Sequence, residues 1–290
     1  MAMSKTLIAS RDPQGLEIVR LCEVALNKSE LDSERAQKVI ERAGEFQSGV
    51  RKLIAELSIS NQYADEDVSS KYGYLSGYLT KPITEQCKIL RQSFPNIPMR
   101  VDEDVTDQAL PSGAEGWFAI PRWQNVAPTY GEAVQIVLDL IKQTRRGKFH
   151  NYRQGQLDPE YLRRSARTSH TMDLIGDQQS EHDILLVPAQ FGLRHRGRSV
   201  RRAREVFTSN EFGLGAYEIG IMLLTHPERL QHYDDLWIDC AGDEFAPLAD
   251  GQFNSAPLFS FYDGKVEFGT RWVNSASAYS GSVSAFVPQC

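Results

Sequence analysis

The sequence predicts an α+β fold, or an irregular α/β fold, for this chain of 290 residues. Apolar residues recur at helical spacing over residues 14–58, whereas short apolar runs typical of strands appear after residue 115. A strand–loop–helix unit at residues 183–209 and an Asp-Gly turn near the C-terminus complete the pattern. We therefore expect an N-terminal helical hairpin, then a mixed domain with a small sheet and a C-terminal β-hairpin.

Three segments follow from this pattern. Residues 1–60 form a helical segment of two amphipathic helices, with a break at Ser29 or at Asp32-Ser33. Residues 61–128 form a loop-rich connector packed on the core, because they are polar and rich in tyrosine and proline. Residues 129–290 form the mixed α/β core domain.

The connector and the first part of the core domain contain one predicted strand and three predicted helices. A short helix spans 82–93, with Thr80 as its capping candidate, and a strand lies near 116–123. Thr129 caps a helix at 130–144 that is apolar on nearly all sides and therefore buried. A further helix is expected from Asp158-Pro159 to about Gln179, which places Arg163 and Arg167 on one face.

The C-terminal part of the chain alternates between strand and helix signals. The run 183–188 is continuously apolar, as in buried parallel strands, and Ser199 is a good N-cap for the helix that follows. An apolar helix covers 216–224, and a short strand covers 236–239. Asp263-Gly264 between alternating runs predicts a β-hairpin.

Composition excludes several classes of protein. Hydrophobic residues make up 41% and charged residues 24%, which excludes a mostly disordered chain, a collagen-like repeat and a disulfide miniprotein. No apolar run is long enough to span a membrane, and the start at Met1–Lys5 has no apolar signal core. The four cysteines are widely spaced and form no C-x-x-C pair, which argues against a zinc ribbon. We expect a cytoplasmic protein with reduced thiols and no membrane partner.

The formal net charge of −6 conceals three blocks of different sign. Residues 1–141 carry −5, residues 142–204 carry +8, and residues 205–290 carry −9. Such an asymmetry indicates either a surface for an anionic partner or two blocks that pair with each other. The sequence leaves both interpretations open.

A dense arginine segment, residues 194–204, leads to the main functional hypothesis. Its predicted ligand-binding residues are Arg194, His195, Arg196, Arg198, Arg201 and Arg202. The first four precede a predicted helix, whose N-terminus repels cations unless an anion sits among them. We therefore predict a phosphate-binding or nucleic-acid-binding protein, although no glycine-rich phosphate-loop motif occurs.

A second hypothesis is a metal-dependent phosphodiesterase or nuclease built on the acidic and histidine residues at 226–244. Its candidate catalytic residues are Asp239, Asp243, Glu244 and His232, and its candidate metal ligands are His226, Asp239 and Asp243. Carboxylates after a buried strand suit Mg²⁺ or Mn²⁺ opposite an arginine clamp. The alternative is a solvated acidic loop, since the spacing matches no metalloenzyme motif.

A third hypothesis is a non-enzymatic structural or assembly protein. In that case the basic block meets the acidic block of the same chain or of another subunit in a homo-oligomer. The sequence does not decide whether the protein is an enzyme, and we lean towards a binding function.

Overall fold

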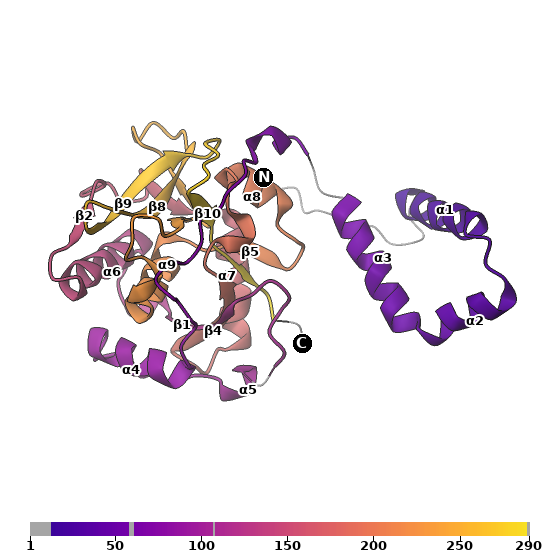
Figure 1. The fold of residues 1–290 in the computed structure, drawn as a ribbon. Helices are drawn as coiled ribbons and strands as arrows, with labels where there is room; N and C mark the ends of the chain where they lie inside the picture. Colours follow the sequence, from indigo (N-terminus) through magenta and orange to yellow (C-terminus); the bar gives the residue numbers. More distant parts are fainter. Residues whose placement is uncertain (1–12, 58–60, 107, 289–290) are drawn as a thin grey trace. The chain divides into compact units, whose positions relative to one another are not determined.

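The computed structural model describes residues 13–57, 61–106 and 108–288. The chain divides into two compact parts: an N-terminal unit, residues 1–59, and a main unit, residues 60–290. The ranges 61–128 and 129–290 of the sequence-based division both fall in the main unit. The α+β class, with N-terminal helices followed by sheets, is confirmed (Figure 1).

The described residues of the N-terminal unit, 13–57, form three helices: α1 (Pro13–Lys28), α2 (Ser33–Glu41) and α3 (Ala43–Leu57). Asp32 caps α2 by accepting a hydrogen bond from the backbone N–H of Arg35 at 2.8 Å, so the predicted break is correct. The second predicted helix is divided at Arg42, where α2 ends and α3 begins. Large apolar side chains stay more than half exposed on α1 and α3, among them Leu16, Phe46 and Leu53.

One sheet of the main unit has four strands in the order β1-β4-β11-β5: β1 (Gly116–Pro121), β4 (Ile184–Gln190), β11 (Ser284–Phe286) and β5 (Glu211–Gly213). Every residue of β4 is buried, as the apolar run predicted. Its two neighbours, β1 and β11, are both antiparallel to it, so the expectation of a parallel strand is wrong. Burial on both faces gives a strand this pattern whatever the direction of its neighbours.

The second sheet contains β10 (Ser280–Ser282), β6 (Trp237–Asp239), β8 (Ser255–Tyr262), β7 (Asp243–Phe245) and β3 (Leu162–Arg164), with β9 (Lys265–Trp272) on β8 and β2 (Phe149–Asn151) on β9. The predicted hairpin is the pair β8–β9. Asp263 and Gly264 join these strands with φ of 48° and 73°. Two positive φ values are what a two-residue type I′ turn requires, which is why Asp-Gly predicted it.

The helices of the main unit are α4 (Ile83–Ser93), α5 (Glu103–Thr106), α6 (Tyr130–Thr144), α7 (Ala166–Gln178), α8 (Val200–Val206) and α9 (Ala216–Thr225). Short 3₁₀ turns lie at η1 (Ala64–Glu66), η2 (Trp123–Asn125), η3 (Leu193–His195) and η4 (Pro227–Arg229). All residues of α9 are buried, and the helix packs on α6, β1 and α4 (Figure 1). The core of the main unit therefore surrounds α9.

The helix caps test the sequence signals directly. Thr129 begins α6 with a capping box to Glu132, and Ser199 accepts from the N–H of Arg202 at the start of α8, both as predicted. Thr80 does not cap α4, which starts after Pro82 without a side-chain cap. The predicted helix from residue 158 is wrong in its first part, because residues 162–164 form β3 and Ser165 caps α7. Arg163 and Arg167 consequently lie on a strand and on a helix.

Within the described ranges, no helix combines the length and the apolar character that crossing a bilayer needs. Cys22, Cys87 and Cys240 are free thiols. The predictions that concern Met1–Lys5 and Cys290 lie outside the described residues.

Candidate functional site

The arginine segment lies on η3, the loop after it and α8, and most of its guanidinium groups bind carboxylates of the same chain. Arg194 binds Glu211 at 3.1 Å and Arg202 binds Glu205 at 2.8 Å. Arg198 binds Asp67 at 3.0 Å. The positive charge of the segment is thus largely compensated by acidic groups of the main unit.

The sequence predicted an anion at the start of α8, and a carboxylate of the same chain occupies this position. Glu66, on η1, accepts hydrogen bonds from Ser199 Oγ at 2.6 Å and from Arg201 Nε at 2.8 Å. The guanidinium of Arg201 holds the pKa of Glu66 below its ordinary value. This carboxylate lies between an arginine and the start of a helix. Its negative charge offsets the repulsion between the arginines and the positive end of the helix dipole, as a phosphate would. No bound ligand is needed to explain this arrangement.

His195 and Glu211 form a buried pair beneath the surface arginines. His195 Nε2 lies 2.7 Å from Glu211 Oε1, and Arg198 Nη1 lies 3.0 Å from His195 Nδ1. Because Arg198 donates to Nδ1, the neutral imidazole donates from Nε2 to Glu211. Burial raises the pKa of Glu211, but hydrogen bonds from His195 and Ser284 and the charge of Arg194 outweigh it and lower this pKa to about 2. This buried pair joins η3, which carries His195, to β5, which carries Glu211.

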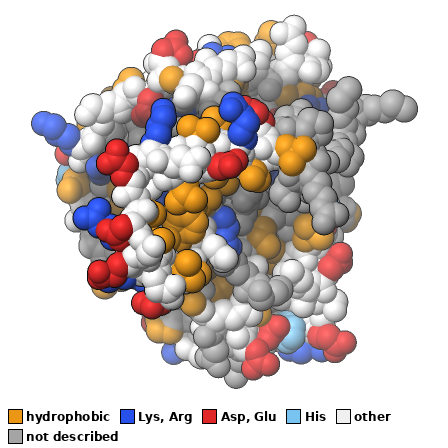
Figure 2. All heavy atoms as spheres, turned by 90° about the vertical axis from the view of Figure 1, so that its right-hand side faces the viewer, with side chains coloured by type: hydrophobic (Ala, Val, Ile, Leu, Met, Phe, Trp, Pro, Cys, Tyr) orange, Lys and Arg blue, Asp and Glu red, His pale blue; other side chains and the backbone are white. Residues whose placement is uncertain are grey.

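Arg196 differs from its neighbours. Its side chain is exposed, and its hydrogen bond goes to a neutral acceptor, the carbonyl oxygen of Tyr72, at 3.2 Å from Nη1. Elsewhere the basic and acidic blocks pair: Arg163 binds Glu244 at 2.8 Å, and Arg164 binds Glu218. Lys and Arg side chains accordingly lie beside Asp and Glu side chains on the face drawn in Figure 2.

The two candidate histidines lie in different surroundings. His226 is buried at the end of α9, where its Nε2 accepts from the backbone N–H of Lys81 at 2.9 Å. Burial lowers the pKa of His226 to about 4, so it is neutral at pH 7. His232 is exposed, and its Nδ1 accepts from the N–H of Asp234 at 3.1 Å. His226 therefore acts as a buried acceptor between α9 and the segment before α4.

The candidate carboxylates also have partners of their own. Asp239, at the end of β6, lies 4.0 Å from Arg271, and burial raises its pKa. Glu244, on β7, pairs with Arg163 across the strands β3 and β7. Asp243, also on β7, accepts from Tyr130 and from the backbone N–H of Ala216. In the described ranges no three His, Cys, Asp or Glu side chains are grouped so that they could hold a metal ion.

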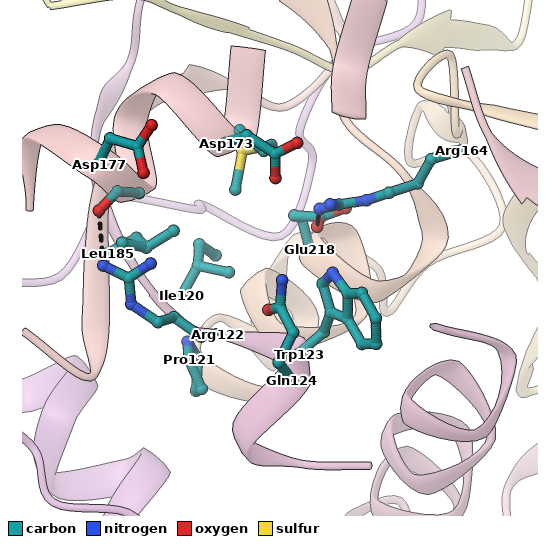
Figure 3. A pocket seen from close by; sticks show the side chains of 12 residues that line it. Ile120, Pro121, Arg122, Trp123, Gln124, Arg164, Asp173, Asp177, Leu185 and Glu218 are labelled. Carbon is teal, nitrogen blue, oxygen red and sulfur yellow. Dashed lines mark hydrogen bonds and ion pairs between the residues drawn. The ribbon is translucent and has the colours of Figure 1, made fainter. Parts of the chain in front are cut away.

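A cavity of about 220 Å³ lies between β1, η2, β3, α7 and α9, and we call it the Arg164 cavity (Figure 3). Its lining residues are Ile120, Pro121, Arg122, Trp123, Gln124, Arg164, Met172, Asp173, Gly176, Asp177, Leu185 and Glu218. The apolar residues come mainly from β1, β4 and the buried face of α7. Five charged side chains converge on this space from different elements, which makes the lining more polar than that of a typical ligand pocket.

A buried ion pair forms one wall of the Arg164 cavity. The side chains of Arg164, on β3, and Glu218, on α9, are 8% and 1% exposed and are joined by a hydrogen bond from Arg164 Nη2 to Glu218 Oε1. Glu218 Oε2 also accepts from the N–H of Gly215 at 3.1 Å, which satisfies a donor at the start of α9. Arg164 Nε is buried and has no hydrogen-bond partner among the described residues. One donor in this wall is therefore unsatisfied.

The ion pair continues into a second buried acid. The Tyr130 hydroxyl donates to Asp243 at 2.9 Å, and Arg164 lies over the Tyr130 ring with its guanidinium carbon 5.0 Å from the ring centroid. Burial and the charge of Glu218 raise the pKa of Asp243 to about 7, although hydrogen bonds from Ala216 and Tyr130 oppose them. Perturbed acids next to a cavity are a common mark of functional sites.

Sequence reasoning missed this site, although one signal was present. Glu218 is the single charged residue in an otherwise apolar helix, and a buried acid needs a cationic or hydrogen-bonding partner. The partner, Arg164, lies 54 residues earlier, in a stretch predicted as helix. Comparisons with protein-family models, curated proteins and solved structures found no match to the chain.

Proposed function

We propose that this protein binds a small polar molecule in the Arg164 cavity. The observation that supports the proposal most directly is the convergence of Arg164, Glu218, Asp173 and Asp177 from three elements, β3, α9 and α7, on one cavity of about 220 Å³. The charged groups that line the cavity can orient a polar ligand.

The test is thermal melting of the full chain in the presence of small amines, alcohols, amides and carboxylates. A ligand at 100 times its Kd stabilises the folded state by about 2.7 kcal/mol, or roughly 5–10 °C for a unit of this size. Arg164→Lys keeps a cation for Glu218 but removes the guanidinium from the cavity wall. Arg163→Lys is the matched control, because Arg163 is exposed and pairs with Glu244.

We expect at least one compound class to raise the melting temperature of the wild type and of Arg163→Lys, but not of Arg164→Lys. The proposal is wrong if no class raises the melting temperature, or if every effect is the same in all three proteins.

A second candidate function is binding of a phosphate-bearing ligand or nucleic acid by the arginine segment, in a protein of the cytoplasm. The exposed side chain of Arg196 and its neutral acceptor favour it, because no carboxylate of the described residues pairs with this cation. Arg196→Ala should weaken retention of a short oligonucleotide and make it less dependent on salt. Unchanged retention and an unchanged salt slope would remove this candidate.

A further inference from the structure

The described helices of the N-terminal unit have no apolar core of their own. Eleven large apolar side chains between residues 16 and 54 are 37–65% exposed, and no apolar side chain in this range is buried. Helices of 16, 9 and 15 residues are only marginally stable in water, because most helical stability in proteins comes from packing an amphipathic face. These three helices therefore need a partner that covers their apolar faces.

The apolar residues of α2 and α3 follow the spacing of a coiled coil. Alternating steps of three and four residues connect six positions, which we call the heptad stripe: Ala36, Val39, Ala43, Phe46, Val50 and Leu53. A stripe with this repeat packs against a second helix. It passes the bend at Arg42 without a shift, and Val39 and Phe46 line one groove of about 310 Å³ there. The pattern thus specifies a helical partner.

Two isoleucines widen the heptad stripe. Ile40 and Ile54 each follow a stripe residue directly and are 65% and 42% exposed. Three apolar positions in a heptad give the broad face of a helix in a bundle, rather than the narrow seam of a two-stranded coiled coil. We therefore expect α2 and α3 to contact more than one partner helix.

The exposed apolar area suits an interface between two copies of the chain. Full burial of a leucine or valine side chain removes about 60–120 Å² of apolar surface from water. The eleven side chains, about half exposed, therefore offer roughly 300–700 Å² per copy. Each partner of a standard interface buries about 800 Å², of which about 55–65% is apolar. The apolar area of the helices matches what one such interface needs.

The charges of these helices favour a protein partner. Residues 13–57 contain seven Lys and Arg and eight Asp and Glu, which gives a formal charge of −1. Helices that bind membrane surfaces or nucleic acids carry an excess of Lys and Arg, which this segment lacks. Its charges pair locally, as Lys38 does with Glu34 at 2.7 Å and Arg42 with Glu45 at 2.5 Å. A nearly neutral surface of this kind does not repel a second copy.

We infer that the N-terminal unit is a dimerisation module, in which the heptad stripes of two copies pack together in a helical bundle. Two-fold symmetric dimers are the commonest assemblies of identical chains, and they bury the same patch of both copies. Such a bundle supplies the apolar core that each copy lacks. The inference does not depend on the Arg164 cavity, which lies in the main unit.

The test is analytical ultracentrifugation of the full chain over a range of protein concentrations. A reducing buffer prevents a disulfide at the exposed thiol of Cys22. The wild type should sediment as a dimer. Phe46→Glu should raise the dimer dissociation constant by at least about 100-fold, because the change occurs on both sides of a symmetric interface. Ser48→Glu is the matched control: it adds the same charge to an exposed position of α3 outside the heptad stripe, and should leave the constant unchanged.

Two further measurements complete the test. Leu53→Glu, at a second position of the heptad stripe, should dissociate the dimer as Phe46→Glu does. Calorimetry should show the main unit melting at the same temperature in both variants, since neither residue belongs to it. Helical circular dichroism should fall on dissociation, because the isolated helices are marginal.

Three results would overturn the inference. A wild type that is monomeric at all concentrations has no such interface, and sedimentation of that monomer with phosphatidylcholine vesicles would show that a membrane covers the helices instead. A dimer of unchanged affinity in both Phe46→Glu and Leu53→Glu uses another surface. Equal weakening by Ser48→Glu and Phe46→Glu would mean that added charge, and not the heptad stripe, decides association.

Discussion

Replacement of Asp243 by asparagine tests the buried polar network behind the Arg164 cavity. In the folded protein the pKa of Asp243 is raised from 3.8 to about 7, chiefly by burial and by the charge of Glu218. A raised pKa means that the folded state binds the proton more tightly than the unfolded state does. The resulting stability is fully present below about pH 4 and is lost as the pH rises through 7.

The size of the effect follows from the pKa values of Asp243 in the folded and unfolded states. A tenfold difference in proton affinity between the two states corresponds to about 1.4 kcal/mol, so the free energy of unfolding should fall by about 2.5 kcal/mol between pH 5 and pH 8 because of this one group. Asparagine has nearly the same shape and does not titrate. The difference in unfolding free energy between wild type and Asp243→Asn should therefore change by that amount over this range.

The assay is urea unfolding of the two proteins at several pH values from 5 to 8. Other titrating groups contribute to both proteins and cancel in the difference. Asp173→Asn is the control, because Asp173 is an exposed acid that takes no part in the hydrogen bonds of Asp243. A flat difference for Asp243→Asn would refute the reasoning, since it would mean that Asp243 is already ionised in the fold at pH 5.

Three further predictions concern the stability of the main unit, which contains the Arg164 cavity. Thr129→Ala removes the cap of α6 and should lower the free energy of unfolding by about 1 kcal/mol in urea titrations, whereas Pro128→Ala, next to the cap, should have less effect. Glu211→Gln should lower the free energy of unfolding by roughly 3 kcal/mol at pH 7. This loss should shrink as the pH falls from 5 towards 2, because the pKa of Glu211 is lowered from 4.5 to about 2 in the folded protein. A loss that does not vary with pH would contradict this prediction. In calorimetry, a fragment of residues 60–290 should melt at the same temperature as the main unit of the full chain, because each unit is compact by itself. A much lower melting temperature of the fragment would show that the two units stabilise each other.

The sequence predicted correctly those turns and helix starts that are decided by one or two neighbouring residues. Asp263-Gly264 specified its turn through two positive φ values, and Thr129 specified the start of α6 through its side chain. The prediction for the segment after Asp158-Pro159 was wrong because its signal resembles a helix start, while pairing of β3 with the distant β7 decides its structure. Sequence periodicity carries no information about such a partner.

The same limit applies to the functional site. The arginine segment was conspicuous in the sequence, but two of the partners that compensate it, Glu66 and Asp67, lie more than 130 residues away. The Arg164 cavity joins side chains from β1, η2, β3, α7 and α9, none of which forms a contiguous motif. Only the solitary charge of Glu218 in an apolar helix could have pointed to it.

The most direct test of the central claim is the NMR signal of the Arg164 Nε–H group. In a ¹H–¹⁵N spectrum of arginine side chains, this signal is identified by its loss in Arg164→Lys. Titration with a compound that raises the melting temperature should shift it progressively to a plateau, with a smaller response or none for the Arg198 Nε–H, which binds Asp67 at 3.0 Å. An Arg164 signal that stays in place while the ligand binds would show that the ligand does not occupy the Arg164 cavity.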